Sequence, residues 1–278
     1  MNQFVGAKRS TAWKQILFII LLVSGYYIWY KHQGKSANHF ATYTEQFDGI
    51  SFKMIAVDGG TFSMGSNTGG EAEHPLHEVK LNNYYLCETV VTQALWKTVM
   101  GSNPSFFKGD SLPVESVSLE MTQAFVLRLN ELTGEHYRLP TEAEWEFAAQ
   151  GGNLSSSYKY SGSDSLNTVG WYGKNSGRKT HAVKQKLANE LGFYDLSGNV
   201  WEWCSDWYGK DYYNDSPIQN PSGPSGGTFR VVRGGSWYFG ADYCRITYRG
   251  SSNPESNSGN IGFRLANNWK NEVDKVKE

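Results

Sequence analysis

Charged residues are missing from one stretch near the N-terminus and are spread through the rest of the chain. Residues 15–30 carry no charge and include the run Ile16-Leu-Phe-Ile-Ile-Leu-Leu-Val23. As a helix rising about 1.5 Å per residue, residues 13–30 would extend about 27 Å, close to the bilayer hydrocarbon thickness of about 30 Å. Four aromatic residues at its end suit the membrane interface: Tyr26, Tyr27, Trp29 and Tyr30. We therefore predict a transmembrane helix, a signal anchor at residues 13–30, after a cytoplasmic segment at residues 1–12.

The same segment can also be interpreted as a cleaved signal peptide. Val23-Ser-Gly25 offers a small-residue cleavage site after a short apolar core. Both interpretations place the rest of the chain on the periplasmic or extracellular side of the cell membrane. Residues 31–50 are polar and predict a linker. A domain is predicted at residues 51–267, followed by a polar tail at residues 268–278.

Capping residues and apolar spacing predict three helices in the first half of the domain. Thr92 can cap a short helix and Ser118 a longer one, and a glycine ends each of them. In the longer helix, apolar residues recur every three or four positions: Met121, Phe125, Leu129 and Leu132. Thr141 and Glu144 form a capping box for a third helix that reaches about Gln150.

From residue 152 onward, glycine and proline clusters leave room only for short strands and long turns. Loops of this length need internal staples, which bound calcium or buried arginine networks can supply. Five arginines lie among glycine and aromatic residues and are candidates for such networks: Arg138, Arg233, Arg245, Arg249 and Arg264. The alternative is that these arginines pair loosely at the surface.

Composition allows a large packed core and gives no sign of a nucleic-acid partner. Of the 278 residues, 39% are hydrophobic and 15% aromatic, which is ample for one globular domain. The 26 basic residues nearly balance the 27 acidic ones, so no overall field favours a polyanion. The three cysteines are too few for a disulfide framework, and their odd number leaves at least one thiol unpaired.

One segment combines carboxylates, a glycine turn and tryptophans: Asp195-Leu-Ser-Gly-Asn-Val-Trp-Glu-Trp-Cys-Ser-Asp-Trp207. In an extended strand, Glu202 and Cys204 would face one side and Trp201 and Trp203 the other. The turn at Gly198 would fold Asp195 back toward Glu202. Oxygen ligands brought together in this way suit calcium. Spacing alone equally fits carboxylates that cap backbone amides or pair with arginines.

Four motifs occur in an order that resembles the formylglycine-generating enzymes, also called sulfatase-modifying factors. They are the Asp195–Trp207 segment and the runs Arg138-Leu-Pro-Thr-Glu-Ala-Glu-Trp-Glu-Phe147, Arg233-Gly-Gly-Ser-Trp237 and Gly262-Phe-Arg-Leu-Ala266. The resemblance extends over about residues 52–267. It implies an α+β fold with little regular secondary structure, distantly similar to C-type lectins.

The resemblance also implies calcium ligands at specific positions. Asp195 and Glu202 would bind through side chains, and Gly198 and Val200 through backbone carbonyls. A second family site would map to four residues across a loop of different length: Asn167, Thr168, Asn175 and Gly177. Calcium is therefore the expected cofactor, in a structural role.

The copper site that the family uses for catalysis is incomplete in this chain. Active members resemble one another in having two cysteines, with four residues between them, that bind copper(I) and oxidise a substrate cysteine. Here the corresponding frame is Phe239-Gly-Ala-Asp-Tyr-Cys244, so phenylalanine stands in the first position. Copper(I) favours soft thiolate ligands, and phenylalanine offers no lone pair. Ser236, Trp201 and Cys244 match cleft positions and are the candidate catalytic residues.

Three functions are compatible with this pattern. The first is a membrane-tethered, exported domain that binds a peptide or protein in the family cleft, or performs unidentified chemistry there, without copper-dependent cysteine oxidation. The second is a true formylglycine-generating oxidase acting on sulfatases. The third is a structural component of an envelope, gliding or secretion complex. The replacement of the first copper-binding cysteine by Phe239 favours the first function.

Overall fold

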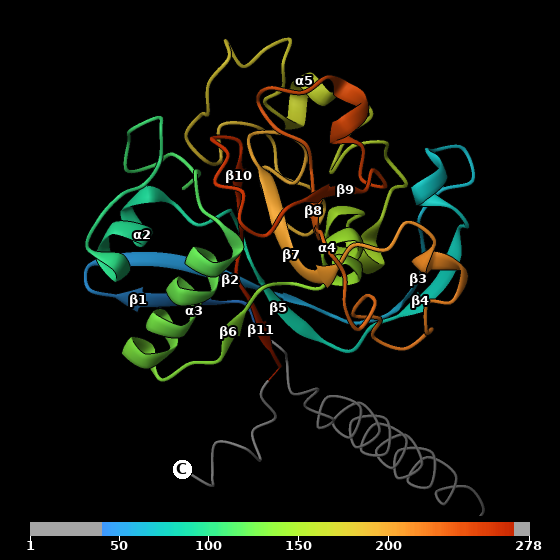
Figure 1. Cartoon of the computed structure of the whole chain (residues 1–278), viewed down its shortest axis with the longest axis horizontal. Helices are drawn as coiled ribbons and strands as arrows, with labels where there is room; N and C mark the ends of the chain where they lie inside the picture. The colour runs from blue at the N-terminus through green and yellow to red at the C-terminus, as the bar shows by residue number, and fades with distance from the viewer. Residues whose placement is uncertain (1–40, 270–278) are drawn as a thin grey trace, which may run out of the picture. The chain divides into compact units, whose positions relative to one another are not determined.

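The structure is a computed structural model that describes residues 41–269 (Figure 1). Its strands are β1 (Tyr43–Phe47), β2 (Ile50–Val57), β3 (Thr61–Met64), β4 (His77–Lys80), β5 (Tyr84–Cys87), β6 (Tyr137–Arg138), β7 (Trp201–Trp207), β8 (Arg230–Arg233), β9 (Gly250–Ser252), β10 (Ile261–Gly262) and β11 (Ala266–Asn268). Its α-helices are α2 (Gln93–Met100), α3 (Leu119–Thr133), α4 (Glu142–Ala149) and α5 (Leu166–Val169). Short 3-10 turns are η1 (Glu71–Glu73), η2 (Gly152–Leu154), η3 (Tyr212–Asn214) and η4 (Ala241–Cys244). The fold is therefore a mixture of helices and short strands, as the sequence predicts.

The larger sheet has the order β1-β2-β5-β11-β6, and every neighbouring pair is antiparallel. Its centre joins distant parts of the chain, because β11, near the C-terminal end, lies between β5 and β6. Leu86 pairs with both Ile55 and Ala266, and all three side chains are buried. Closing the sheet thus requires the last strand, so the fold depends on contacts between the two ends of the domain.

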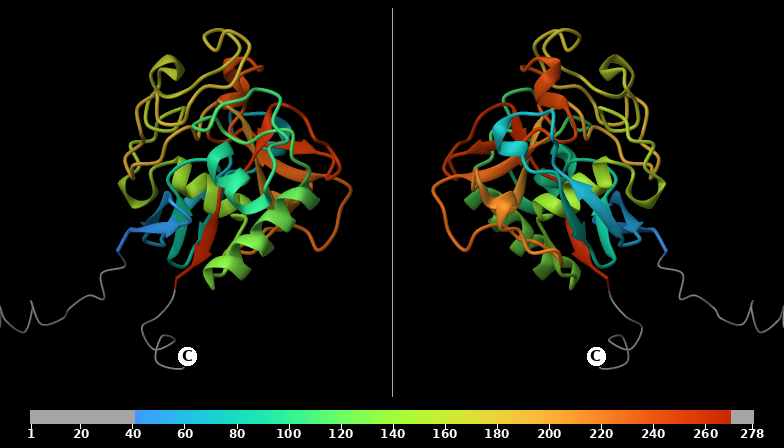
Figure 2. Two further views of the ribbon diagram at one scale, coloured as in Figure 1. Left: turned by 90° about the vertical axis from the view of Figure 1, so that its left-hand side faces the viewer. Right: turned by 90° about the vertical axis from the view of Figure 1, so that its right-hand side faces the viewer.

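The smaller sheet has the order β10-β7-β8-β9 and places the Asp195–Trp207 segment at its centre. The expected alternation in β7 is confirmed, since Trp201 and Trp203 enter one hydrophobic cluster and Cys204 enters another. Both faces of the strand are therefore buried. In Figures 1 and 2, α5 and the loops around it lie at the upper end of the molecule, while β1, β2 and β11 lie at the lower end.

The three predicted helices are confirmed, together with their caps. The side chains of Thr92, Ser118 and Thr141 accept N-terminal backbone hydrogen bonds of α2, α3 and α4, and Thr141 forms its capping box with Glu144. The predicted apolar stripe of α3 is only partly right. Phe125 and Leu129 are buried, whereas Leu132 lies at the surface. Phe125 stacks on Trp96, with ring centroids 5.1 Å apart, and this contact joins α3 to α2.

The sheet begins earlier than the predicted domain start at residue 51. Strand β1 lies within the predicted linker, residues 31–50, and pairs along its length with β2. Its side chains alternate between half-buried and exposed, a pattern that the polar composition of this segment obscures. Between residues 41 and 269, no helix is long and apolar enough to cross a membrane. The predicted anchor at residues 13–30 and the tail from residue 270 onward lie outside the described residues.

Arginine–glutamate pairs hold the loops of the second half in place, which confirms the predicted arginine network. Arg264 pairs with Glu202 at 2.6 Å, and Arg249 with Glu142 at 2.8 Å. Arg233 pairs with Glu146 and also lies 3.7 Å from Glu142. These three arginines are almost completely buried. Arg138 and Arg245 pair with Glu144 and Glu73 nearer the surface.

Candidate functional site

Four aromatic rings surround a cleft beside the central strand β7. Trp201 contacts Phe239 and Tyr248 at centroid distances of 5.7 and 6.0 Å. Tyr243 contacts Phe239 and Tyr248, each at 5.0 Å. Each of these four rings therefore contacts two of the others, and we call the four residues the aromatic ring set. It lines a pocket of about 480 Å³.

Small polar residues also line the cleft. Ser251, Ser252, Ser256, Ser258 and Asn260 line it together with Arg249. Arg249 donates two hydrogen bonds to Glu142, both 2.8 Å long, so its charge is already neutralised. The cleft thus combines aromatic rings with hydroxyl groups, and no unpaired charged group lines it among residues 41–269.

Phe239 occupies its place in the cleft because the chain turns sharply just before it. Gly234 and Gly235 have φ values of +93° and +73°, a left-handed conformation that glycine adopts without strain. Ser236 is fully buried, and its hydroxyl accepts a hydrogen bond from the Tyr238 backbone N–H at 3.3 Å. Phe239 itself begins the segment leading into η4. Ser236 therefore supports the turn and does not line the cleft.

Cys244 does not line the cleft. It is fully buried in a small cluster with Tyr160, Leu166, Val169 and Tyr172. Burial raises the pKa of its thiol to about 12, and the sulfur lies 3.9 Å from the Gly240 carbonyl oxygen. The thiol is consequently protonated at neutral pH. Of the three predicted catalytic residues, only Trp201 lines the pocket.

The sulfur atoms of the chain do not combine into a copper site. Cys87, Cys204 and Cys244 are all free and buried, and each belongs to a different hydrophobic cluster. Burial raises the pKa of Cys87 to about 11 and that of Cys204 well above its usual value. A copper(I) ion needs accessible thiolates, and this donor set does not fit it.

The first predicted calcium set is brought together, but its two carboxylates differ. Glu202 is fully buried and accepts two hydrogen bonds from Arg264, at 2.6 and 2.7 Å, and one from the Trp145 indole at 2.8 Å. Asp195 is buried without a basic side chain paired to it. Its oxygens accept a backbone N–H from Lys184 at 3.0 Å and a longer contact from Asn199 at 3.4 Å.

Asp195 is the carboxylate that lacks a cation. Burial raises its pKa to about 6, with the nearby charge of Glu202 adding to the shift. The predicted turn is confirmed next to it, since Gly198 and Asn199 have φ values of +96° and +62°. A calcium ion bound by Asp195 and the carbonyls of Gly198 and Val200 would supply the missing positive charge. The donor set fits calcium in this respect, with Glu202 shared with Arg264.

The second predicted calcium set is engaged in protein contacts. The Lys186 ammonium donates to the Asn167 backbone carbonyl at 2.6 Å and lies 4.0 Å from the Trp171 ring. The Asn167 side chain accepts from the Tyr172 hydroxyl at 3.1 Å, and Asn175 bonds to the Gly170 carbonyl at 3.0 Å. Thr168 accepts the Leu187 N–H through its carbonyl, and Gly177 lies on an exposed turn. A lysine therefore already supplies a positive charge at this set.

The sequence predicts Trp201 as a cleft residue but does not predict Tyr243 and Tyr248. Tyr243 and Tyr248 come from η4 and the turn after it, and only the fold brings them to Trp201. Their positions could have indicated a role in the cleft, because Tyr243 and Tyr248 lie on either side of Cys244 in the sequence.

Comparison with known proteins places this cleft in a family. A profile described as "Sulfatase-modifying factor enzyme 1-like domain" matches residues 40–269. The chain belongs to the sulfatase-modifying factor family. The formylglycine-generating enzyme of Streptomyces coelicolor is 32% identical, over 77% of this chain and 88% of the enzyme. The chaperone protein LppX of Paenibacillus barcinonensis is 32% identical, over 78% of this chain and 89% of that protein.

The fold is shared with solved structures of the family type. Treponema denticola variable protein 1 superposes with a TM-score of 0.78 at 34% identity, covering 82% of this chain and 99% of that one. Calcium and copper are known ligands of sulfatase-modifying factors. Within residues 41–269, no group of three or more histidine, cysteine or acidic side chains is arranged to hold a metal.

Proposed function

We propose that this sulfatase-modifying factor relative binds a peptide or protein segment in its aromatic cleft and does not oxidise cysteine with copper. One observation carries the proposal. Where the copper frame places its first sulfur, Phe239 puts a ring in contact with Trp201 and Tyr243. The second sulfur, that of Cys244, is buried in a separate cluster, and burial raises the pKa of its thiol to about 12.

The chemistry of the cleft supports peptide recognition. Aromatic rings offer a large contact area at a small entropic cost, and hydroxyl groups adapt to backbone donors and acceptors. The Tyr243 side chain is 39% exposed, so a ligand can cover it and gain from its burial. The Paenibacillus relative is a chaperone protein, which also favours protein binding.

A peptide-display selection against the purified protein tests this function. We expect enriched peptides whose affinity falls about tenfold or more in Tyr243→Ala, because aromatic residues at the centre of interfaces contribute most of the binding energy. Tyr158→Ala is the matched control, since Tyr158 is 40% exposed and lies outside the cleft. Failure to enrich any peptide, or equal binding by both variants, would contradict the proposal.

The rival function is a copper-dependent oxidase, favoured by the family membership and by the retained Ser236, Trp201 and Cys244. It requires tight copper(I) binding through sulfur. The arrangement of the three cysteines supports the binding function over this rival, because their thiols lie in separate clusters.

Export and tethering are part of the same proposal. The uncharged residues 15–30 and the interfacial aromatic residues support a single-pass anchor, with the domain on the periplasmic or extracellular side. Removing residues 1–30 should then release the protein from the membrane fraction, and persistence there would argue against an anchor.

We further propose that the chain binds one calcium ion, at Asp195, and not two. Asp195 lacks a cation, whereas Lys186 already donates to the Asn167 carbonyl of the second set. Calcium should therefore raise the melting temperature and chelation should lower it, because an ion that binds only the native state stabilises that state. Elemental analysis should give about one equivalent of calcium per chain, because only the Asp195 site has a carboxylate without an ion-pair partner. No bound calcium, together with an unchanged melt, would refute the site.

Asp195→Asn gives this calcium proposal a second readout. In the native protein the pKa of Asp195 is raised to about 6 from 3.8. Between these values the native state binds more protons than the unfolded state, so wild-type stability falls as pH rises through this window. Without calcium, the Asn variant should be the more stable at about pH 8, and its advantage should vanish near pH 4.

Saturating calcium should reverse the order at about pH 8, because the ion then neutralises the carboxylate. Urea unfolding of both proteins, with calcium and with chelator, makes the comparison. If calcium leaves the difference between wild type and variant unchanged, Asp195 does not bind the ion.

A further inference from the structure

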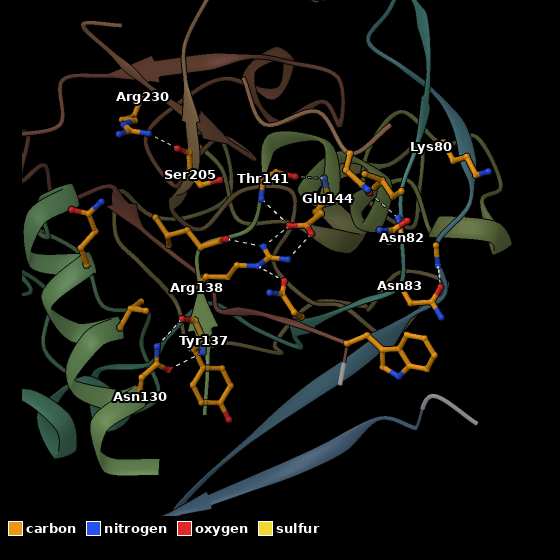
Figure 3. A pocket seen from close by; sticks show the side chains of 18 of the residues that line it. Lys80, Asn82, Asn83, Asn130, Tyr137, Arg138, Thr141, Glu144, Ser205 and Arg230 are labelled. Atoms are coloured by element: carbon orange, nitrogen blue, oxygen red, sulfur yellow. Dashed lines mark hydrogen bonds and ion pairs between the residues drawn. The ribbon is translucent and has the colours of Figure 1, made fainter. Parts of the chain in front are cut away.

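A second and larger pocket lies away from the aromatic cleft and shares no lining residue with it. Its volume is about 1110 Å³, at the upper end of the size typical of small-molecule sites. It lies between α3, the loop from β4 to β5, β6 and the N-terminus of α4 (Figure 3). Nothing in the proposed function uses this pocket.

An ion pair lies at the centre of this pocket, and both oxygens of its carboxylate already accept hydrogen bonds from the protein. Arg138 donates to both oxygens of Glu144, at 2.6 and 2.7 Å, and Glu144 also accepts the Thr141 backbone N–H at 2.9 Å. Figure 3 shows these bonds converging on one carboxylate. Glu144 is the only acidic residue that lines the pocket.

Three asparagines around the ion pair have fixed orientations. Their side-chain oxygens accept from groups that can only donate: the Gly59 N–H for Asn83, the Asn82 N–H for Asn220 and the Arg138 Nε–H for Asn268. Each amide must therefore present its NH₂ group elsewhere. Among residues 41–269 these three NH₂ groups have no hydrogen-bond partner, so the pocket offers donors.

Two cations add to these donors. Arg230 stacks on Trp207 at 3.6 Å and donates to the Ser205 carbonyl, while its buried Nε–H has no hydrogen-bond partner. Neither Arg230 nor Lys80 lies within ion-pair distance of a carboxylate in the described part of the chain, and Figure 3 places them on either side of the Arg138–Glu144 pair. Three basic residues against one carboxylate leave a net charge of +2 in the lining.

One wall of the pocket is apolar. Leu119, Val126 and Leu127 of α3 line it together with Leu139. Leu127 is 63% exposed, which is unusual for a leucine that lines a cavity. An apolar group lying against this wall would cover it and gain from its burial.

We propose that this pocket binds an amphipathic anion, a carboxylate or phosphate group carried on an apolar chain. Carboxylate and phosphate oxygens only accept hydrogen bonds, which matches a lining with a net positive charge and three asparagine NH₂ donors. The anionic group lies on the Lys80 side of the pocket, near the asparagine NH₂ groups, and Arg230 adds positive charge on the other side of the ion pair. The apolar chain lies along α3 against Leu127.

Titration calorimetry on the full chain tests the site with four probes below their micelle concentrations: decanoate, decyl phosphate, the neutral decyl maltoside and inorganic phosphate. We expect saturable binding of decanoate and decyl phosphate at one per chain. Tighter binding of decyl phosphate would identify phosphate as the preferred group, and tighter binding of decanoate would identify carboxylate.

Two variants and two matched controls locate the binding. Lys80→Gln and Leu127→Ser should each weaken it about three- to tenfold, through the lost charge and the lost apolar contact respectively. Lys179→Gln removes an exposed lysine outside the pocket, and Leu187→Ser removes a leucine that is 64% exposed; both should bind as wild type. The inference is overturned if neither anion binds saturably, if decyl maltoside or inorganic phosphate binds as well as they do, or if the controls lose as much affinity.

Discussion

Replacing Arg264 by methionine should lower the free energy of unfolding by about 3–5 kcal/mol, because it leaves the carboxylate of Glu202 buried without its cation. Both side chains are fully buried, and Arg264 also donates to the backbone carbonyls of Cys87 and Tyr194, each at 3.0 Å. Its guanidinium therefore joins the end of β5, the turn at Asp195 and the central strand β7. Urea unfolding monitored by tryptophan fluorescence measures the loss.

The control for this variant is Arg128→Met, on the exposed face of α3. Arg128 pairs with Glu131 at 3.0 Å, but both side chains are more than half exposed, so the loss should stay below about 1 kcal/mol. Adding Glu202→Gln to Arg264→Met should recover part of the lost stability, since no buried charge remains. Equal losses for Arg264→Met and Arg128→Met would show that the buried pair contributes no more than a surface one.

Gly198→Ala should be nearly as damaging, with a loss of about 3 kcal/mol or more. Gly198 has φ +96°, and a Cβ there would meet the Trp171 carbonyl carbon at 2.9 Å and its oxygen at a still shorter distance. Both atoms belong to the backbone, so they cannot move aside as a side chain could. The turn that carries Asp195 would have to open, which should also weaken calcium binding.

Gly134→Ala separates the steric effect from the effect of backbone conformation. Gly134 ends α3 at φ +72°, and nothing lies within 4 Å of an added Cβ. Gly134→Ala should lower the free energy of unfolding by only about 1–2 kcal/mol, the cost of placing alanine in a left-handed conformation. Thermal melts of the two variants should therefore differ clearly, and similar melts would show that the contact with Trp171 is not rigid.

Local features of this fold were predictable from the sequence because local chemistry determines them. The caps Thr92, Ser118 and Thr141 each accept a backbone N–H group three residues away, so the signal and its partner lie together in the chain. The turn at Gly198 was predictable for the same reason. The partners of the arginines were not, because Arg264 and Glu202 are 62 residues apart.

Strand β1 and the aromatic ring set show why the remaining features were missed. Strand β1 is a short, polar edge strand, and only its pairing with β2 identifies it. Tyr248 reaches Trp201 because β7, β8 and β9 pair side by side, and no local pattern specifies that geometry. The pocket beside Arg138 is likewise lined by residues from five strands, two helices and several loops, which are far apart in the sequence.

We propose that the aromatic cleft recognises a ligand and does not oxidise it. The most direct test incubates the purified protein with copper(I), oxygen and a peptide containing Cys-x-Pro-x-Arg, beside Phe239→Cys, and follows the peptide mass. We predict no mass loss at the peptide cysteine and no sulfur-bound copper in the wild-type protein, because Phe239 offers no ligand and the Cys244 thiol is buried and protonated. A loss of mass in the wild-type reaction that disappears in Cys244→Ala would contradict the account.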